Sequence, residues 1–177
     1  MALRGNKSPQ GEATRILEQL KITKPSVPVE KVARSLGAQI RFRPLDDEIS
    51  GMIYIKDDVP IIGVNSLHHP NRQRFTIAHE CGHLIFDRDL ISQEIHVDKQ
   101  FVVLRRDDRS ATGLEKIEIQ ANQFAAELIM PRIFLLHSLG NRAIDIDDSG
   151  LVRRLAQQFK VSEEAMRIRL SNLFFVR

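Results

Sequence analysis

A helical segment that carries two histidines one turn apart places the strongest constraint on this fold. Between residues 72 and 86, apolar side chains recur along one helical stripe, at Phe75, Ala78, Cys81, Leu84 and Ile85. Within this segment, residues 79–83 have the sequence His-Glu-Cys-Gly-His. At about 100° per residue, the two histidines lie about 40° apart on one face. The pattern therefore predicts a helix that packs on one side and presents two imidazoles together.

The HExxH pattern at residues 79–83 is typical of a catalytic metal site when it lies in a helix. His79 and His83 can reach a single ion, and Glu80 projects beside them without taking a coordination position. Glu80 can therefore accept a proton from a water molecule held by the metal, as a general base. A pattern this short also arises by chance. The alternative is a surface-facing helix whose histidines only make hydrogen bonds.

Two histidines leave a catalytic zinc site one ligand short, because such sites take three protein ligands and a water molecule. A second helix, predicted from about Leu114 to Met130, offers Glu118, with Asn122 one turn further along the same face. We expect Glu118 to bind the metal and Asn122 to orient a histidine. Glu115 is the rival ligand, and a solvated helix carboxylate is the alternative role for Glu118.

The other side chains with reactive chemistry have simpler interpretations. Cys81 points into the apolar stripe, where a buried, inert thiol is expected. Gly82 costs about 1 kcal/mol relative to Ala inside a helix, which indicates the close approach of another element. Tyr54 is a possible oxyanion stabiliser, with cross-strand packing as the simpler role. The remaining histidines have no partner at ligand spacing, and we interpret them as surface or core residues: His68, His69, His96 and His137.

The rest of the chain predicts an α+β fold around the HExxH helix. Apolar spacing and turn residues predict helices at about 13–20 and 29–36, and strands at 38–42, 51–55 and 61–64. Residues 56–58 join the last two strands in a hairpin, so we expect a small antiparallel sheet. A second hairpin (94–98 with 101–104) and an exposed loop at 105–110 follow. From about residue 133 the chain is expected to be helical, ending in two helices that meet near residues 159–162.

Length, charge and cysteine content limit the classes of protein that fit. A chain of 177 residues predicts one domain, residues 11–140, with a helical appendage at 141–177. The 26 basic and 23 acidic side chains leave a net charge of +3, far from the concentrated basic stripe of a nucleic-acid-binding protein. One cysteine forms no intrachain disulfide, residues 1–10 lack the apolar core of a signal peptide, and no apolar run has the length of a membrane span. We expect a cytoplasmic protein that does not contact membranes.

Two stretches of sequence resemble a known family. Residues 74–83, Arg-Phe-Thr-Ile-Ala-His-Glu-Cys-Gly-His, and residues 118–131, Glu-Ile-Gln-Ala-Asn-Gln-Phe-Ala-Ala-Glu-Leu-Ile-Met-Pro, are similar to the ImmA/IrrE family of metallo-endopeptidases. Shorter matches at 27–37, 50–51 and 64–65 extend the resemblance over about residues 13–173. The resemblance implies a zincin-like metallopeptidase domain that hydrolyses peptide bonds. Cys81 departs from the family pattern, which commonly has leucine there.

The resemblance also implies a Glu-zincin-like site, one metal ion per chain and a specific protein substrate. In this site His79, His83 and Glu118 hold the metal and Glu80 is the general base. Zinc suits this donor set, and Mn²⁺ or Fe²⁺ are alternative ions for the same ligands. The implied substrate is a helix-turn-helix transcriptional repressor, whose cleavage releases genes for stress response or for transfer of a mobile genetic element.

Residues 155–170 resemble a helix-turn-helix, which suggests DNA binding. However, Glu163 and Glu164 occupy the first turn of the second helix, where their charge would repel phosphates. Five positive side chains lie nearby, at Arg153, Arg154, Lys160, Arg167 and Arg169. We expect contact with the protein substrate and no specific DNA binding. The alternative is a non-catalytic regulator that binds DNA or a repressor through residues 150–173, with a structural metal.

Overall fold

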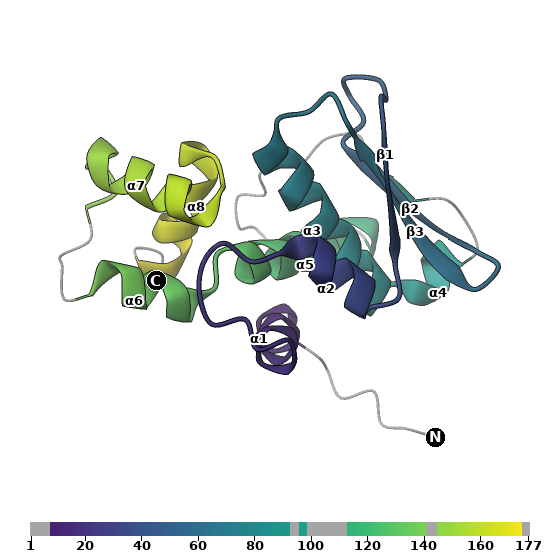
Figure 1. The fold of residues 1–177 in the computed structure, drawn as a ribbon, viewed down its shortest axis with the longest axis horizontal. Helices are drawn as coiled ribbons and strands as arrows, with labels where there is room; N and C mark the ends of the chain where they lie inside the picture. Colours follow the sequence, from purple (N-terminus) through teal and green to yellow (C-terminus); the bar gives the residue numbers. More distant parts are fainter. Residues whose placement is uncertain (1–7, 93–95, 99–112, 141–144, 175–177) are drawn as a thin grey trace.

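The computed structural model describes residues 8–92, 96–98, 113–140 and 145–174. The chain has an α+β fold in which helices pack against one four-stranded sheet (Figure 1). Two helices precede the sheet, α1 (Pro9–Gln19) and α2 (Val29–Ser35). Both match the helices expected near residues 13–20 and 29–36, and α1 begins earlier because Ser8 caps it and Pro9 suits its first turn.

The sheet is mixed, with strand order β1-β3-β2-β4. The expected hairpin joins β2 (Gly51–Lys56) to β3 (Val59–Asn65), and its turn residues Asp57 and Asp58 have φ values of 50° and 62°. Two consecutive positive φ values are typical of the type I′ turn that suits a two-residue hairpin. β1 (Gln39–Arg43) pairs with β3 in parallel, so the prediction of an antiparallel sheet was wrong for this strand.

Asn65 explains why β1 lies beside β3 instead of β2. Its buried side chain donates hydrogen bonds to the carbonyl oxygens of Leu45, Asp46 and Ile49, at 3.2, 3.1 and 2.9 Å. These bonds hold the loop at 44–50 over the end of β3. The chain thus passes over the end of β3 before it enters β2, and β3 lies between β1 and β2 in the sheet.

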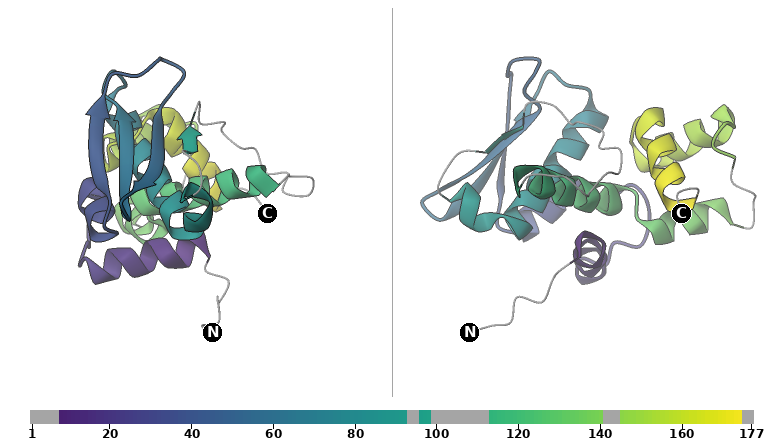
Figure 2. Two further views of the ribbon diagram at one scale, coloured as in Figure 1. Left: turned by 90° about the vertical axis from the view of Figure 1, so that its right-hand side faces the viewer. Right: turned by 180° about the vertical axis from the view of Figure 1, so that it is seen from behind.

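Two long helices form the centre of the molecule. α3 (Pro70–Phe86) packs against β2 and β3 on one side and against α5 (Gly113–Ile129) on the other (Figures 1 and 2). The helices meet at Gly82, where an added Cβ would lie 2.9 Å from the Cα of Ala121. This confirms the expected close approach of another element at Gly82.

A short helix and an edge strand follow α3. α4 (Arg88–Ile91) leads to β4 (His96–Asp98), which pairs with β2 antiparallel, with His96 opposite Ile53. β4 confirms the last three residues of the strand expected at 94–98. The expected partner strand at 101–104 and the loop at 105–110 lie outside the described residues.

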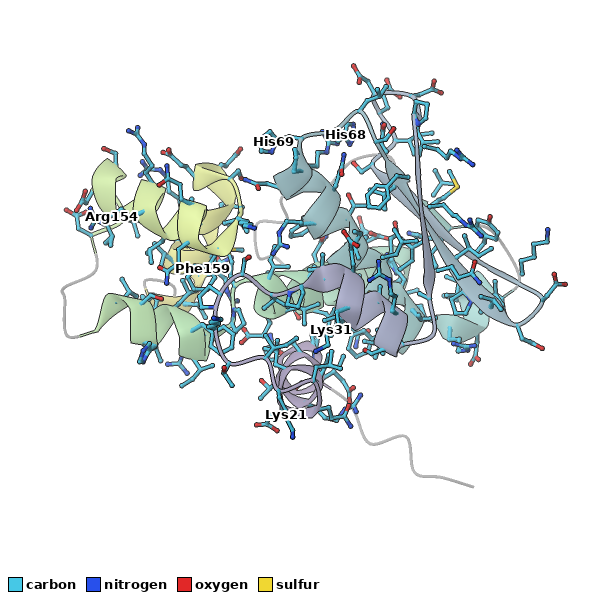
Figure 3. The ribbon with its side chains drawn as sticks, in the orientation of Figure 1. Lys21, Lys31, His68, His69, Arg154 and Phe159 are labelled. Carbon is cyan, nitrogen blue, oxygen red and sulfur yellow. The ribbon has the colours of Figure 1, made fainter. Side chains whose placement is uncertain are left out.

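The C-terminal part is helical, as expected. It comprises α6 (Arg132–Leu139), α7 (Ser149–Phe159) and α8 (Glu163–Phe174). Asp148 caps α7 by accepting hydrogen bonds from the backbone of Gly150 and Leu151, and the buried Phe159 ends the helix (Figure 3). No helix in the described residues is long and apolar enough to span a membrane.

A buried ion pair joins the C-terminal helices to α5. Arg169 on α8 pairs with Glu127 near the end of α5, and its Nε also donates to the carbonyl oxygen of Met130 at 3.1 Å. Glu127 in turn accepts a hydrogen bond from the backbone of Arg132 at 3.0 Å, at the start of α6. One carboxylate therefore fixes the end of α5, the start of α6 and the middle of α8.

Candidate metal centre

The two long helices bring the three predicted ligands together. His79 and His83 are buried on α3, with their Nε2 atoms 3.0 Å apart. Glu118 approaches from α5, with its carboxylate oxygens 3.3 Å from His79 Nε2 and 3.4 Å from His83 Nε2. The helical spacing of α3 and the crossing at Gly82 thus produce the arrangement that the sequence predicted.

A fourth potential ligand corrects the interpretation of His96 as an ordinary surface or core residue. The Nε2 atom of His96 lies 3.1 Å from Glu118 Oε1, and its ring centroid lies 4.1 Å from that of His83. The donor atoms of His79, His83, His96 and Glu118 all lie within 4.8 Å of one another. The pairing of β4 with β2 brings His96 there, which spacing along the sequence does not reveal.

The other three histidines lie elsewhere. His68 and His69 are near the start of α3 (Figure 3), where His69 accepts a hydrogen bond from the backbone of Asn71. His137 is exposed on α6. Their interpretation as ordinary histidines agrees with these positions.

The donor set fits a divalent metal ion. Ligand distances of about 2.0–2.1 Å in a tetrahedral zinc site place neighbouring donor atoms about 3.3 Å apart. The separations between adjacent donors here are 3.0, 3.1, 3.3 and 3.4 Å. Imidazole nitrogen and carboxylate oxygen are ligands of zinc and also of manganese and iron. A site of this size holds one ion.

Polar partners orient both histidines of α3. His79 Nδ1 lies 3.1 Å from Asn122 Oδ1, and His83 Nδ1 lies 3.3 Å from Asp87 Oδ2. Such partners fix the ring so that Nε2 faces the metal position. Asn122 thus lies beside a histidine, as expected from its position one turn after Glu118. Asp87 was missed, although its position four residues after His83 on one helix face is a signal that could have found it.

Charges within the group alter its protonation. Burial opposes the charged form of His83, but hydrogen bonds to Asp87 and Glu118 outweigh it and raise its pKa to about 10. Burial likewise opposes the charged form of Glu118, yet hydrogen bonds from the three histidines hold the pKa of its carboxyl well below the usual range. Without metal, the negative charge of the Glu118 carboxylate therefore balances the positive charge of the protonated His83 ring.

Glu80 is fully buried where α3 faces β2. A Cβ added at Gly51 would lie 3.2 Å from Glu80 Oε1 and 2.3 Å from Thr76 Cγ2, so the glycine leaves room for both side chains. Glu80 is not one of the four grouped donors, which agrees with a base that does not bind the metal. Cys81 is also buried, and burial together with the charge of Glu80 raises the pKa of its thiol, as expected for an inert cysteine.

The structure does not bring Tyr54 or Glu115 into the group. Tyr54 is three residues beyond Gly51 on β2, and strand alternation places these two residues on opposite faces of the sheet. Because Gly51 faces α3, Tyr54 faces away from it. Glu115 is exposed one turn before Glu118, and Glu118 is the carboxylate of the group.

A cleft of about 1160 Å³ lies between the first turns of α3 and the helix pair α7–α8. Its lining includes Arg72 and Phe75 from α3, with Lys160 and Glu164 from the helix pair. The ring of Phe75 stacks on His79 with their centroids 6.4 Å apart. One aromatic side chain therefore connects the wall of the cleft to the candidate metal centre.

Residues 33–171 match the Peptidase_M78 family, described as the IrrE N-terminal-like domain. This chain belongs to that family. It is 42% identical over 74 residues to the radiation response metalloprotease IrrE of Deinococcus radiodurans, a match that covers 40% of this chain and 19% of the relative. A solved structure described as a Mycobacterium tuberculosis transcriptional regulator matches with a TM-score of 0.62 and 21% identity. That match covers 96% of this chain and 48% of the other, and it shows a shared fold.

Proposed function

We propose that this chain is a metal-dependent endopeptidase that hydrolyses a peptide bond in a specific protein substrate. The convergence of His79, His83 and Glu118, with Glu80 buried beside them, is the observation that carries the proposal. Membership of the Peptidase_M78 family supports a metalloprotease-type function. Zinc is the proposed ion, because two imidazoles and one carboxylate are a donor set of catalytic zinc sites.

Each residue of the group has a defined part in the proposed reaction. When bound, the metal supplies Lewis-acid polarisation of the scissile carbonyl and acidifies a water molecule. Glu80 takes the proton of the attacking water and delivers it to the leaving amine, as general base and then general acid. Asn122 and Asp87 keep the rings of His79 and His83 in position through hydrogen bonds at their Nδ1 atoms.

The proposed substrate is a helix-turn-helix repressor, which docks at the cleft beside α7 and α8. Several positive charges of this helix pair have partners within the protein: Arg169 pairs with Glu127, Arg153 with Glu163, and Arg167 donates to a backbone carbonyl. Guanidinium groups engaged in this way are poorly placed to neutralise DNA phosphates. In this proposal residues 11–140 perform the chemistry and residues 141–177 hold the substrate, in the cytoplasm.

The Glu80→Gln variant tests the chemistry. The amide keeps the shape of the side chain but does not accept the proton, so cleavage should be lost while metal content stays the same. We would compare new protein N termini in cells that express the wild type, Glu80→Gln or the control Glu115→Gln, and measure metal in each purified protein. Equal cleavage by wild type and Glu80→Gln would contradict the enzyme proposal.

The non-catalytic alternative makes a different prediction. A regulator that binds DNA through residues 150–173 would protect a defined operator at physiological salt without any repressor present. Its affinity would also fall by about 0.9 log units per log of salt for each phosphate contacted. Footprinting with purified protein at two salt concentrations distinguishes the two functions.

A further inference from the structure

We propose that His96 is a fourth protein ligand of the resting metal centre and occupies the coordination position that a catalytic site leaves to water. This inference rests on the proposed metal centre and specifies how access to it is controlled. Structural zinc sites are closed by four protein ligands, whereas catalytic sites use three and keep one position open. The described residues supply four donors where the peptidase reaction requires three.

The position of His96 is that of a ligand. Its Nε2 atom is as close to Glu118 Oε1 as the nitrogen of His83 is, at 3.1 Å against 3.4 Å. A histidine that only made a hydrogen bond to Glu118 would have no need to lie near the other imidazoles. His96 does lie near them, with its donor atom within 4.8 Å of those of His79 and His83.

The exposed fractions of the four side chains show on which side of the metal centre His96 lies. The side chains of His79 and His83 are 0% and 1% exposed, whereas those of His96 and Glu118 are 29% and 36% exposed. His96 and Glu118 therefore form the solvent-facing side of the group. Glu80, the proposed base, has no exposed surface. We therefore infer that water and a substrate carbonyl approach the metal from the side of His96 and Glu118.

The strand that carries His96 is short enough to let this side chain move away from the metal. His96 belongs to a three-residue strand that, among the described residues, lies at the edge of the sheet and pairs with β2 through Gly51, Met52 and Ile53. The other two histidines belong to a helix of 17 residues at the centre of the molecule. Substrate can therefore displace His96 without disturbing the ligands on α3 and α5.

Metal affinity tests whether His96 is a ligand. We would measure Zn²⁺ affinity by competition with a chromophoric chelator, and the visible absorption of the Co²⁺-loaded protein, for wild type, His96→Ala, His96→Gln and the control His137→Ala. Glutamine retains a hydrogen-bond donor toward Glu118 but is a poor metal ligand. Both His96 variants should lose at least about tenfold in affinity and change the Co²⁺ spectrum, while His137→Ala should match the wild type.

An external ligand tests whether His96 occupies the open position. Acetohydroxamate must displace His96 in the wild type but not in His96→Ala, so it should bind Co²⁺-loaded His96→Ala about tenfold more tightly or better. Unchanged Zn²⁺ affinity, Co²⁺ spectrum or acetohydroxamate affinity in folded His96 variants would overturn this inference and leave the proposed function intact. A wild type that binds no metal would overturn both.

Discussion

At the scale of single residues, Glu118 is the ligand whose assignment depends most on packing. It and Glu115 lie one turn apart on α5, and only Glu118 reaches the histidines of α3. We predict that Glu118→Ala loses metal, because it removes the carboxylate of the group and with it the negative charge that faces all three histidines, whereas Glu115→Ala retains it. Elemental analysis after gel filtration measures both. Full occupancy in Glu118→Ala with loss in Glu115→Ala would reverse the assignment.

Metal binding should release a proton. The raised pKa of His83, about 10, means that its ring is protonated near neutral pH without metal, and a metal binds only the neutral ring. Metal affinity should therefore rise as pH rises, by about tenfold per unit below the pKa of His83.

Calorimetry in two buffers of different ionisation enthalpy measures this release near neutral pH. We expect about one proton per metal ion in the wild type. In Asp87→Asn the release should be smaller, because one of the hydrogen bonds that raise the pKa of His83 is weakened. A heat of binding that is the same in both buffers would show that no proton is released.

The residues whose positions could be predicted from the sequence are those whose geometry is set within one helix. His79 and His83 are four residues apart on α3, and Glu118 and Asn122 are four residues apart on α5, so helical periodicity alone places each pair on one face. His96 could not be found in this way. Its position depends on the pairing of an edge strand with β2, and strand pairing is a contact between segments distant in sequence.

At the scale of helices and strands, the crossing of α3 and α5 controls the metal centre. Ala121 is fully buried beneath Gly82 and lies between Glu118 and Asn122 on α5. In Gly82→Ala, the added methyl should push α5 away and move Glu118 from the histidines. Overpacking costs about 1–3 kcal/mol, of which the better helix propensity of alanine offsets about 1 kcal/mol.

Gly113→Ala is the matched control for this substitution, since a Cβ at Gly113 has no neighbour within 4 Å among the residues that the structure describes. Urea unfolding and chelator competition should show lower stability and weaker metal binding for Gly82→Ala only. If Gly82→Ala bound metal with wild-type affinity, α5 would not need this close approach to position Glu118.

Among the strands, the hairpin was predictable and the placement of β1 was not. Residues 56–58 signal a turn locally, through side chains that tolerate positive φ. The parallel pairing of β1 instead depends on where Asn65 holds the loop at 44–50, through three hydrogen bonds across 16 to 20 residues. Such a long-range contact leaves no periodic pattern in the sequence.

At the scale of the whole molecule, the pair of Glu127 and Arg169 joins the C-terminal helix α8 to the central helix α5. Arg169→Met should leave the carboxylate of Glu127 buried without its partner and cost about 3–5 kcal/mol of unfolding free energy. Arg154→Met, at an exposed position of α7 (Figure 3), should change stability little. Thermal melts followed by circular dichroism compare the variants, and equal melting temperatures would show that this pair does not hold α8 in place.

The same helix carries Glu118 toward its beginning and Glu127 toward its end. Nine residues separate them, a rise of about 14 Å along a helix. If α7 and α8 hold the substrate, the length of α5 fixes the distance between the docking site and the metal centre. The scissile bond would then be chosen by its distance from the docked element, and substrates with unrelated sequences around that bond would be cut equally well.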